Sequence, residues 1–177
     1  MDLQSKRLIL KETDWDDLTI IHALHCEPQV EQFNTLGIPG NPEVTRAVIA
    51  GPIEDRNKRI RTLYEWTVRL EESSQVIGVA GISLGAERFR SAEIHYSLFP
   101  EFWGNGYAYE ALFCIMKFCF KTLGLHRIYA GVAVENSRSI KLLEKLGMQR
   151  EGRGREVLPI RGEWMDNYRY AILENEF

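Results

Sequence analysis

The feature that most constrains the fold is a change of hydrophobic period in the second half of the chain. A helical stripe of apolar side chains runs over residues 108–123: Ala108, Leu112, Ile115, Met116, Cys119, Phe120 and Leu123. A strand-like run over residues 91–99 precedes this stripe, and a buried strand-like run over residues 127–134, RIYAGVAV, follows it. This order of strand, helix and strand predicts an α/β domain.

The other elements extend the pattern over the whole chain. Asn136 is a good N-cap for a helix with an apolar stripe at Ile140, Leu143 and Leu146, and Gly147 stands where that helix should end. We also expect strands at 7–11, 64–70, 75–84 and 163–173, and helices from 13 or 14 to about 25 and from 42 or 43 to about 58. Residues 28–41 look loose, and the basic segment 150–161 looks irregular. The sequence therefore predicts one α/β domain, residues 1–177, with a mixed sheet.

Composition excludes several classes of protein. The net charge of −3 and the pI of about 5.9 argue against binding driven by nucleic-acid phosphates. No apolar run approaches the length of a membrane helix, and the N-terminus has no signal-peptide core. Three cysteines do not form a disulfide framework, so we expect reduced thiols and a cytoplasmic protein. The four histidines show no metal-ligand spacing, and we expect no metal site.

Gly104 and Gly106 stand between the strand-like run at 91–99 and the helical stripe. At a helix start several N–H groups lack partners and the helix dipole is positive, so an anion fits there, and glycine lets the backbone approach it closely. A dinucleotide fingerprint would need a third glycine where Tyr109 stands, and no Gly-Lys-Ser/Thr phosphate loop follows. On spacing alone, an anion cradle and a plain structural turn both remain open.

Three strings of residues, WGNGYA at 103–108, ENSRSIKLLEKLGM at 135–148 and GEWMD at 162–166, occur in this order along the chain. They resemble motifs of the Gcn5-related N-acetyltransferase (GNAT) superfamily. WGNGYA at 103–108 is similar to its pyrophosphate signature Q/R-x-x-G-x-G/A, with Trp103 at the Gln or Arg position; the longer FWGNGYAYEA resembles the branch that acetylates ribosomal-protein N-termini (RimJ/RimL-like). ENSRSIKLLEKLGM at 135–148 resembles the later motif, in which an asparagine opens a helix that ends in Gly-Phe. GEWMD at 162–166 resembles the run before the final strand. With the RLILKE opening, the resemblance spans nearly the whole chain and implies a mixed, mostly antiparallel sheet flanked by helices.

The resemblance implies acetyl-coenzyme A (acetyl-CoA) as donor and a primary amine as acceptor. It places the cofactor on Ser97, Leu98 and Phe99 at a strand end, on Gly104, Asn105, Gly106, Tyr107 and Ala108 in the cradle, and on Asn136 opposite. The pantetheine arm would pair with the strand edge, and a backbone N–H near Phe99 would polarise the thioester carbonyl. Asn136 is equally well explained as a helix cap alone.

Two residues are candidates for catalysis. Glu93 matches the strand glutamate that serves as base in histone-acetylating members, and alternation places it on one face with His95, Ser97 and Phe99 unless a bulge intervenes. His95 is a rival base, and Glu93 is also explained as a solvated carboxylate. Many relatives use a helix tyrosine to protonate the departing thiolate, but Leu143 stands there. Ser139 is the substitute, or only a residue of the first helical turn.

The least similar segments, 29–42 and 150–161, should hold the acceptor. Glu27, Glu31 and Glu43 are candidates to attract a cation, and Phe33 and Trp164 to line the walls. We expect an N-acetyltransferase for a protein N-terminus or a small amine that works by direct attack in a ternary complex, as a monomer or homodimer. The alternative is a non-catalytic acyl-CoA sensor or partner protein on the same fold.

Overall fold

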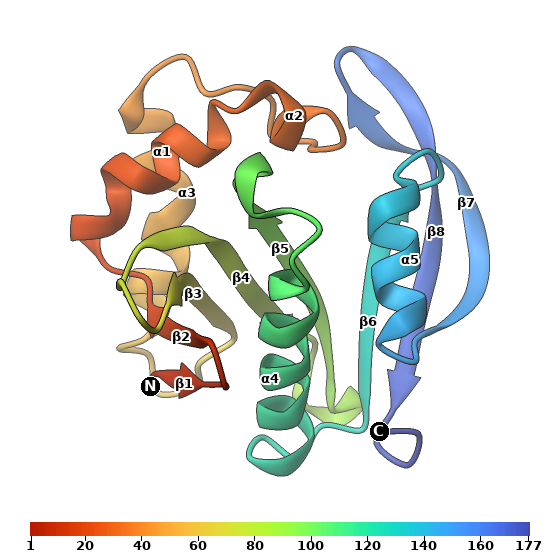
Figure 1. Ribbon diagram of the computed structural model, residues 1–177. Coiled ribbons are helices and arrows are strands. Elements are labelled where there is room, and N and C mark those ends of the chain that lie inside the picture. Colours follow the sequence, from red (N-terminus) through yellow and green to blue (C-terminus); the bar gives the residue numbers. More distant parts are fainter.

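A single eight-stranded sheet runs through the computed structural model, which describes residues 1–177, in the order β1-β2-β3-β4-β5-β6-β8-β7 (Figure 1). The strands are β1 (Leu3–Gln4), β2 (Leu8–Glu12), β3 (Leu63–Leu70), β4 (Val76–Leu84), β5 (Ser91–Leu98), β6 (Arg127–Ala133), β7 (Gln149–Ile160) and β8 (Glu163–Leu173). The helices are α1 (Leu18–His25), α2 (Pro28–Glu31), α3 (Pro42–Asp55), α4 (Tyr107–Lys121) and α5 (Ser137–Lys145). The mixed, mostly antiparallel sheet expected from the sequence is confirmed.

The sheet splits between β5 and β6, its only parallel pair of strands. Ser91–Glu93 pairs with Arg127–Tyr129, and from there on β5 pairs only with β4 and β6 only with β8. Figure 1 shows the two strands diverging from this short contact into a V. Each strand therefore presents an unpaired backbone edge to the gap.

Strand alternation sends side chains to two different cores. The even-numbered Ala92, Ile94 and Leu98 of β5 belong to the large core under α4, which Figure 1 shows on the same face as α5. A smaller core on the opposite face joins Val79 of β4 and Phe99 to apolar side chains of α1 and α3, namely Ile21, Leu24, Ile49 and Ile53. The gap between β5 and β6 therefore has helices on both sides of the sheet.

One expectation about secondary structure is wrong. Residues 150–161 were expected to be irregular, but all except Arg161 belong to β7, an edge strand of 12 residues. Only Gly154 and Ile160 of β7 are buried, and its register against β8 shifts twice, so no regular apolar alternation marks it. Pairing with β8 along its length makes it a strand.

The remaining expected elements form within a few residues of their predicted ends. The last strand has the predicted bounds, and Asn136 caps α5 by accepting a hydrogen bond from the Ser139 N–H at 3.1 Å. The region that begins at Pro28 contains the four-residue α2, which the sequence did not indicate. None of the helices has the length and apolar character needed to cross a membrane.

Candidate active site

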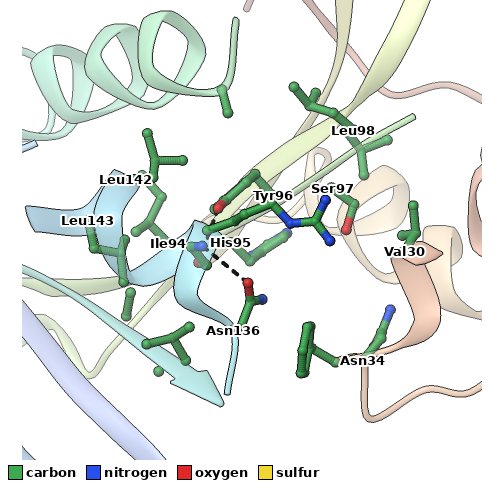
Figure 2. Close-up of a pocket in the computed structure, with 18 of the residues that line it drawn as sticks. Val30, Asn34, Ile94, His95, Tyr96, Ser97, Leu98, Asn136, Leu142 and Leu143 are labelled. Carbon is green, nitrogen blue, oxygen red and sulfur yellow. Dashed lines mark hydrogen bonds between the residues drawn. The ribbon is translucent and has the colours of Figure 1, made fainter. Parts of the chain in front are cut away.

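A cavity of about 860 Å³ occupies the V between β5 and β6. Figure 2 shows Tyr96, His95 and Ser97 of β5 in its middle, with Asn136, the N-cap of α5, and Leu142 and Leu143 of α5 on one side and Val30 and Asn34 on the other. We call the side formed by the start of α4, by β6 and by α5 the α4–α5 half. The α1–α3 half is formed by residues 25–52 and by the faces of β3, β4 and β5 that carry Glu65, Val79 and His95.

The predicted anion cradle lies at the N-terminus of α4. Gly104 and Gly106 both have φ of +79°, a conformation that side-chain-bearing residues rarely adopt. Gly106 is the N-cap and supplies no capping side chain, and the N–H groups of Tyr107, Ala108 and Tyr109 donate to no acceptor in the protein. These N–H groups form a positive helix end beside the cavity, which suits an anion.

Asn105 differs from its neighbours in the cradle. Gly104, Gly106, Tyr107 and Ala108 line the cavity, but Asn105 does not. The side chain of Asn105 turns back and donates to the Trp103 carbonyl at 3.2 Å. Any contribution of Asn105 to an anion therefore comes from its backbone.

Cations on α5 supplement the cradle. The Arg138 guanidinium lies over the Trp103 ring, 4.2 Å from its centroid, and the Lys145 amine lies 4.8 Å from the centroid of Tyr109. Both side chains line the cavity, as does Lys141. Trp103 occupies the Gln or Arg position of the signature. Its ring contacts the guanidinium of Arg138 from α5, so a positive charge is present here although position 103 itself carries none. The local motif alone cannot show this contact.

The free edge of β5 corrects one expectation. The Phe99 N–H donates to the Ile77 carbonyl at 2.9 Å and is not available to a ligand, and Phe99 does not line the cavity. Successive N–H groups of a strand point to opposite sides, so the N–H groups of Tyr96 and Leu98 face the gap. Ser97 and Leu98 line the cavity as expected, and Leu98 offers the backbone donor that the sequence assigned to Phe99.

A pair of hydroxyl groups crosses the cavity. Tyr96 O–H donates to Ser139 Oγ at 3.0 Å, which joins β5 to the first turn of α5. Burial raises the pKa of Tyr96, although the hydrogen bond to Ser139 acts in the opposite direction. The phenol therefore keeps its proton at neutral pH. Tyr96 was not a sequence candidate, since nothing in the local pattern shows that it reaches Ser139.

A histidine and a carboxylate meet on the other face of the sheet. His95 Nε2 lies 2.6 Å from Glu65 Oε2, and the two residues flank Gly81 in one row across β3, β4 and β5. A Cβ on Gly81 would lie 2.2 Å from the Glu65 carboxylate and 2.6 Å from His95 Nε2. Glycine at this position is therefore what allows the two side chains to meet across the middle strand.

The environment of His95 favours its protonated form. Burial lowers the pKa of His95, but the Glu65 carboxylate, through its charge and its hydrogen bond, and the charge of Glu93 raise it to a net value above the usual one. The side chain still has 49% of its surface exposed, since it faces the open cavity. The β4–β5 register is unbroken from Ala92 to Leu98, so the predicted common face of Glu93, His95 and Ser97 is confirmed.

The acidic residues expected around the acceptor are placed elsewhere. Glu31 is buried in an ion pair with Arg161 at 2.8 Å, and neither Glu27 nor Glu43 lines the cavity. Phe33 lines the cavity as expected, but Trp164 does not and is 64% exposed. The Glu31–Arg161 pair instead joins α2 to the tip of the β7–β8 hairpin, which lies near it across the V in Figure 1.

A split sheet with an amide cradle on one side of the gap and a His–Glu pair on the other is the arrangement expected of a coenzyme A-dependent acyltransferase. A family model described as "Acetyltransferase (GNAT) domain" matches residues 7–149. The chain belongs to this family and is an acetyl-CoA-dependent acyltransferase.

Three relatives illustrate the range of the family. An uncharacterized N-acetyltransferase, YoaA, of Bacillus subtilis (strain 168) is 30% identical over 97% of this chain and 96% of its own length. The [ribosomal protein uS5]-alanine N-acetyltransferase of Escherichia coli (strain K12) is 32% identical over 57% of this chain and 53% of its own. The crystal structure of spermidine N-acetyltransferase from Vibrio cholerae, in complex with CoA and spermine, superposes with a TM-score of 0.85 at 26% identity and covers 97% of this chain and 98% of its own.

Proposed function

We propose that this protein transfers an acetyl group from acetyl-CoA to a primary amine by direct attack within a ternary complex. The observation that carries the proposal is the cavity in the split sheet, which places the unpartnered N–H groups of α4 and the His95–Glu65 pair around one space. The acceptor is a protein N-terminal α-amine or a small amine, the two kinds of acceptor named for relatives. The motifs quoted above favour the ribosomal-protein-alanine branch.

The α4–α5 half has the groups that acetyl-CoA requires. Bound there, acetyl-CoA supplies an activated acetyl thioester. We assign its pyrophosphate to the N–H groups from Gly104 to Ala108, supplemented by Arg138. The free edge of β5 at Ser97 and Leu98 pairs with the pantetheine amides, and the Leu98 N–H faces the thioester carbonyl. The Asn136 carbonyl oxygen accepts from Ser139 N–H, which leaves its amide N–H₂ free for the cofactor.

The attacking amine must lose a proton, because a lysine-type amine has a pKa of about 10.4 and an α-amine of about 8. We propose that His95 accepts this proton as the general base. Glu65 holds the imidazole in place, with its Oε2 2.6 Å from His95 Nε2. Glu93 lies on the same face, two residues nearer the closed end of the V, where its carboxylate attracts the ammonium group. Glu93 as the base itself is the alternative that the resemblance favours, and the variants His95→Gln and Glu93→Gln distinguish these assignments.

Ser139 and Tyr96 form the corresponding acid. Because Ser139 Oγ accepts the Tyr96 proton, the proton of Ser139 is free to point into the cavity. Ser139 then donates its proton toward the departing thiolate and takes the Tyr96 proton in exchange, and the Tyr96 phenolate regains a proton from solvent before the next turnover. The contribution is modest, since a thiol with a pKa of about 8.5 leaves tolerably without assistance.

The proposal also covers the location of the enzyme, its oligomeric state and its partners. We propose a cytoplasmic enzyme, in line with three cysteines that are all free. We propose that it works as a monomer or homodimer on its amine substrate, without nucleic acid, membrane or metal. No group of three or more His, Cys, Asp or Glu side chains is placed to hold a metal ion.

The direct test is thiol release from acetyl-CoA in the presence of a panel of amines and short peptides, with the acetylated product identified by mass. Wild type should release thiol only when an acceptor is present, and CoA should raise the melting temperature, whereas a dinucleotide should not. His95→Gln and Glu93→Gln are measured in parallel. Stabilisation by CoA without thiol release from any acceptor would contradict the proposed function and favour a CoA sensor.

A further inference from the structure

The distribution of charge in the α1–α3 half is unlike that of the α4–α5 half. Every cavity-lining residue from Gln29 to Pro52 is uncharged: Gln29, Val30, Phe33, Asn34, Thr35, Leu36, Val48, Ile49 and Pro52. The only carboxylates that line any part of the cavity are Glu65 and Glu93. Glu65 lies on β3 and Glu93 on β5, beside the position that we propose for the reacting amine.

Neither carboxylate can serve a second cation farther out. Glu65 is held by His95 at 2.6 Å, and Glu93 lies near the closed end of the V. Glu31, the acidic residue of α2, is buried against Arg161. A second ammonium group among the side chains of residues 29–52 would therefore lose water without gaining a counter-charge, which is unfavourable.

Two apolar side chains at the edge of this half are exposed to solvent. Leu36 is 59% exposed and Val48 is 39% exposed, yet both line the cavity, next to Val30 and Phe33. Apolar surface that stays in water beside a pocket is typical of a ligand-binding surface. An apolar group on the acceptor would cover it.

We propose that the acceptor carries a single primary amine on an apolar body, and that polyamines are poor acceptors. The proposal rests on the proposed function and names the substrate class of the same site. An arylalkylamine and a peptide whose first side chain is apolar both have this chemistry. In each, the ammonium group reaches Glu93 and His95 while the apolar body contacts Val30, Phe33 and Leu36.

Matched amines test the charge rule in wild-type protein. Pentylamine and 1,5-diaminopentane have the same chain length and differ only in a second ammonium group. We expect kcat/KM to be at least tenfold higher for pentylamine, and higher again for 2-phenylethylamine. Equal values, or a preference for 1,5-diaminopentane or spermidine, would overturn the proposal.

Two peptide arms distinguish the sources of the amine. Tripeptides that begin with Phe or with Glu are compared with 2-phenylethylamine under the same conditions. Acetylation of the Phe peptide assigns the site to a protein N-terminus, and acetylation of 2-phenylethylamine alone assigns it to a small molecule; either result supports an apolar acceptor. A preference for the Glu peptide contradicts it.

A pair of exposed positions on one loop provides a matched control. Leu36→Glu adds a carboxylate to the cavity lining, whereas Ile38→Glu makes the same change at a 52% exposed residue that does not line it. We expect Leu36→Glu to lower kcat/KM about tenfold for 2-phenylethylamine and to raise it for 1,5-diaminopentane, with Ile38→Glu unchanged. Equal effects of the two substitutions would overturn the proposal.

Failure of this proposal and failure of the proposed function give different results. If the acceptor class is wrong, diamines or acidic peptides are acetylated at least as fast as apolar amines. If the function is wrong, no acceptor releases thiol, although CoA still raises the melting temperature.

Discussion

The two halves of the cavity are lined by different chemical groups. The α4–α5 half presents backbone N–H groups and three cations, Arg138, Lys141 and Lys145, from segments that lie close together in the chain. The α1–α3 half presents the uncharged side chains of residues 29–52, with His25, Glu93 and the His95–Glu65 pair, brought together from α1, the segment after it, α3 and three strands. Backbone N–H groups do not change when the sequence changes, so the α4–α5 half suits a ligand that stays the same, such as acetyl-CoA. Side chains can be substituted, so the α1–α3 half can change its specificity for the acceptor. Substitutions in the two halves should therefore alter different kinetic constants.

The largest effect is expected for His95→Gln in the α1–α3 half. Loss of the base should lower kcat/KM for the amine about 100- to 1000-fold at pH 7, because general-base catalysis contributes on this scale. The KM for acetyl-CoA should stay unchanged, and steady-state kinetics with each substrate varied in turn measures both constants. Glu93→Gln should be milder if His95 is the base. The reverse order would return the proton transfer to Glu93.

Glu65→Gln is expected to have the next largest effect, and it should shift the dependence of kcat/KM on pH. A base works when neutral, so activity rises with pH through the pKa of His95, and Glu65 raises that pKa. The variant should therefore move the acid limb of the kcat/KM profile to lower pH. It should also lower the plateau about tenfold, since His95 is no longer held in place. A profile that keeps its wild-type position would exclude Glu65 as the group that positions His95.

The same contrast explains how much the sequence could predict. The helix starts at Gly106 and Asn136 that form the proposed cradle were predictable, because the glycines, the asparagine and the two helices occur in ordered motifs with clear periodicity. The contact of His95 with Glu65 was not, since it depends on the pairing of three strands and on the missing side chain of Gly81.

Strand register also explains why two smaller predictions from the sequence were wrong. The free donor is at Leu98 and not at Phe99, since the Phe99 N–H is taken by Ile77. Likewise β7 was hidden, because an exposed edge strand with two register shifts carries no apolar alternation.

Arg138→Ala should have a smaller effect, confined to the α4–α5 half. Removing the cation from Trp103 is expected to raise the KM for acetyl-CoA about five- to tenfold, on the scale of a charge-assisted hydrogen bond, with kcat nearly unchanged. Arg88→Ala is a matched control, since Arg88 also lies over an aromatic ring, that of Phe89, and does not line the cavity. An equal change in both variants would assign the effect to net charge alone.

Tyr96→Phe should have the smallest effect, and it tests whether the hydroxyl pair acts as a unit. The substitution removes only the donor to Ser139, so kcat should fall about threefold to fivefold, since CoA leaves tolerably as a thiolate. Ser139→Ala should cost a similar factor. The double variant should be no slower than the slower single variant, because either substitution already interrupts the Tyr96-to-Ser139 relay. Additive losses would show that the two hydroxyl groups act independently.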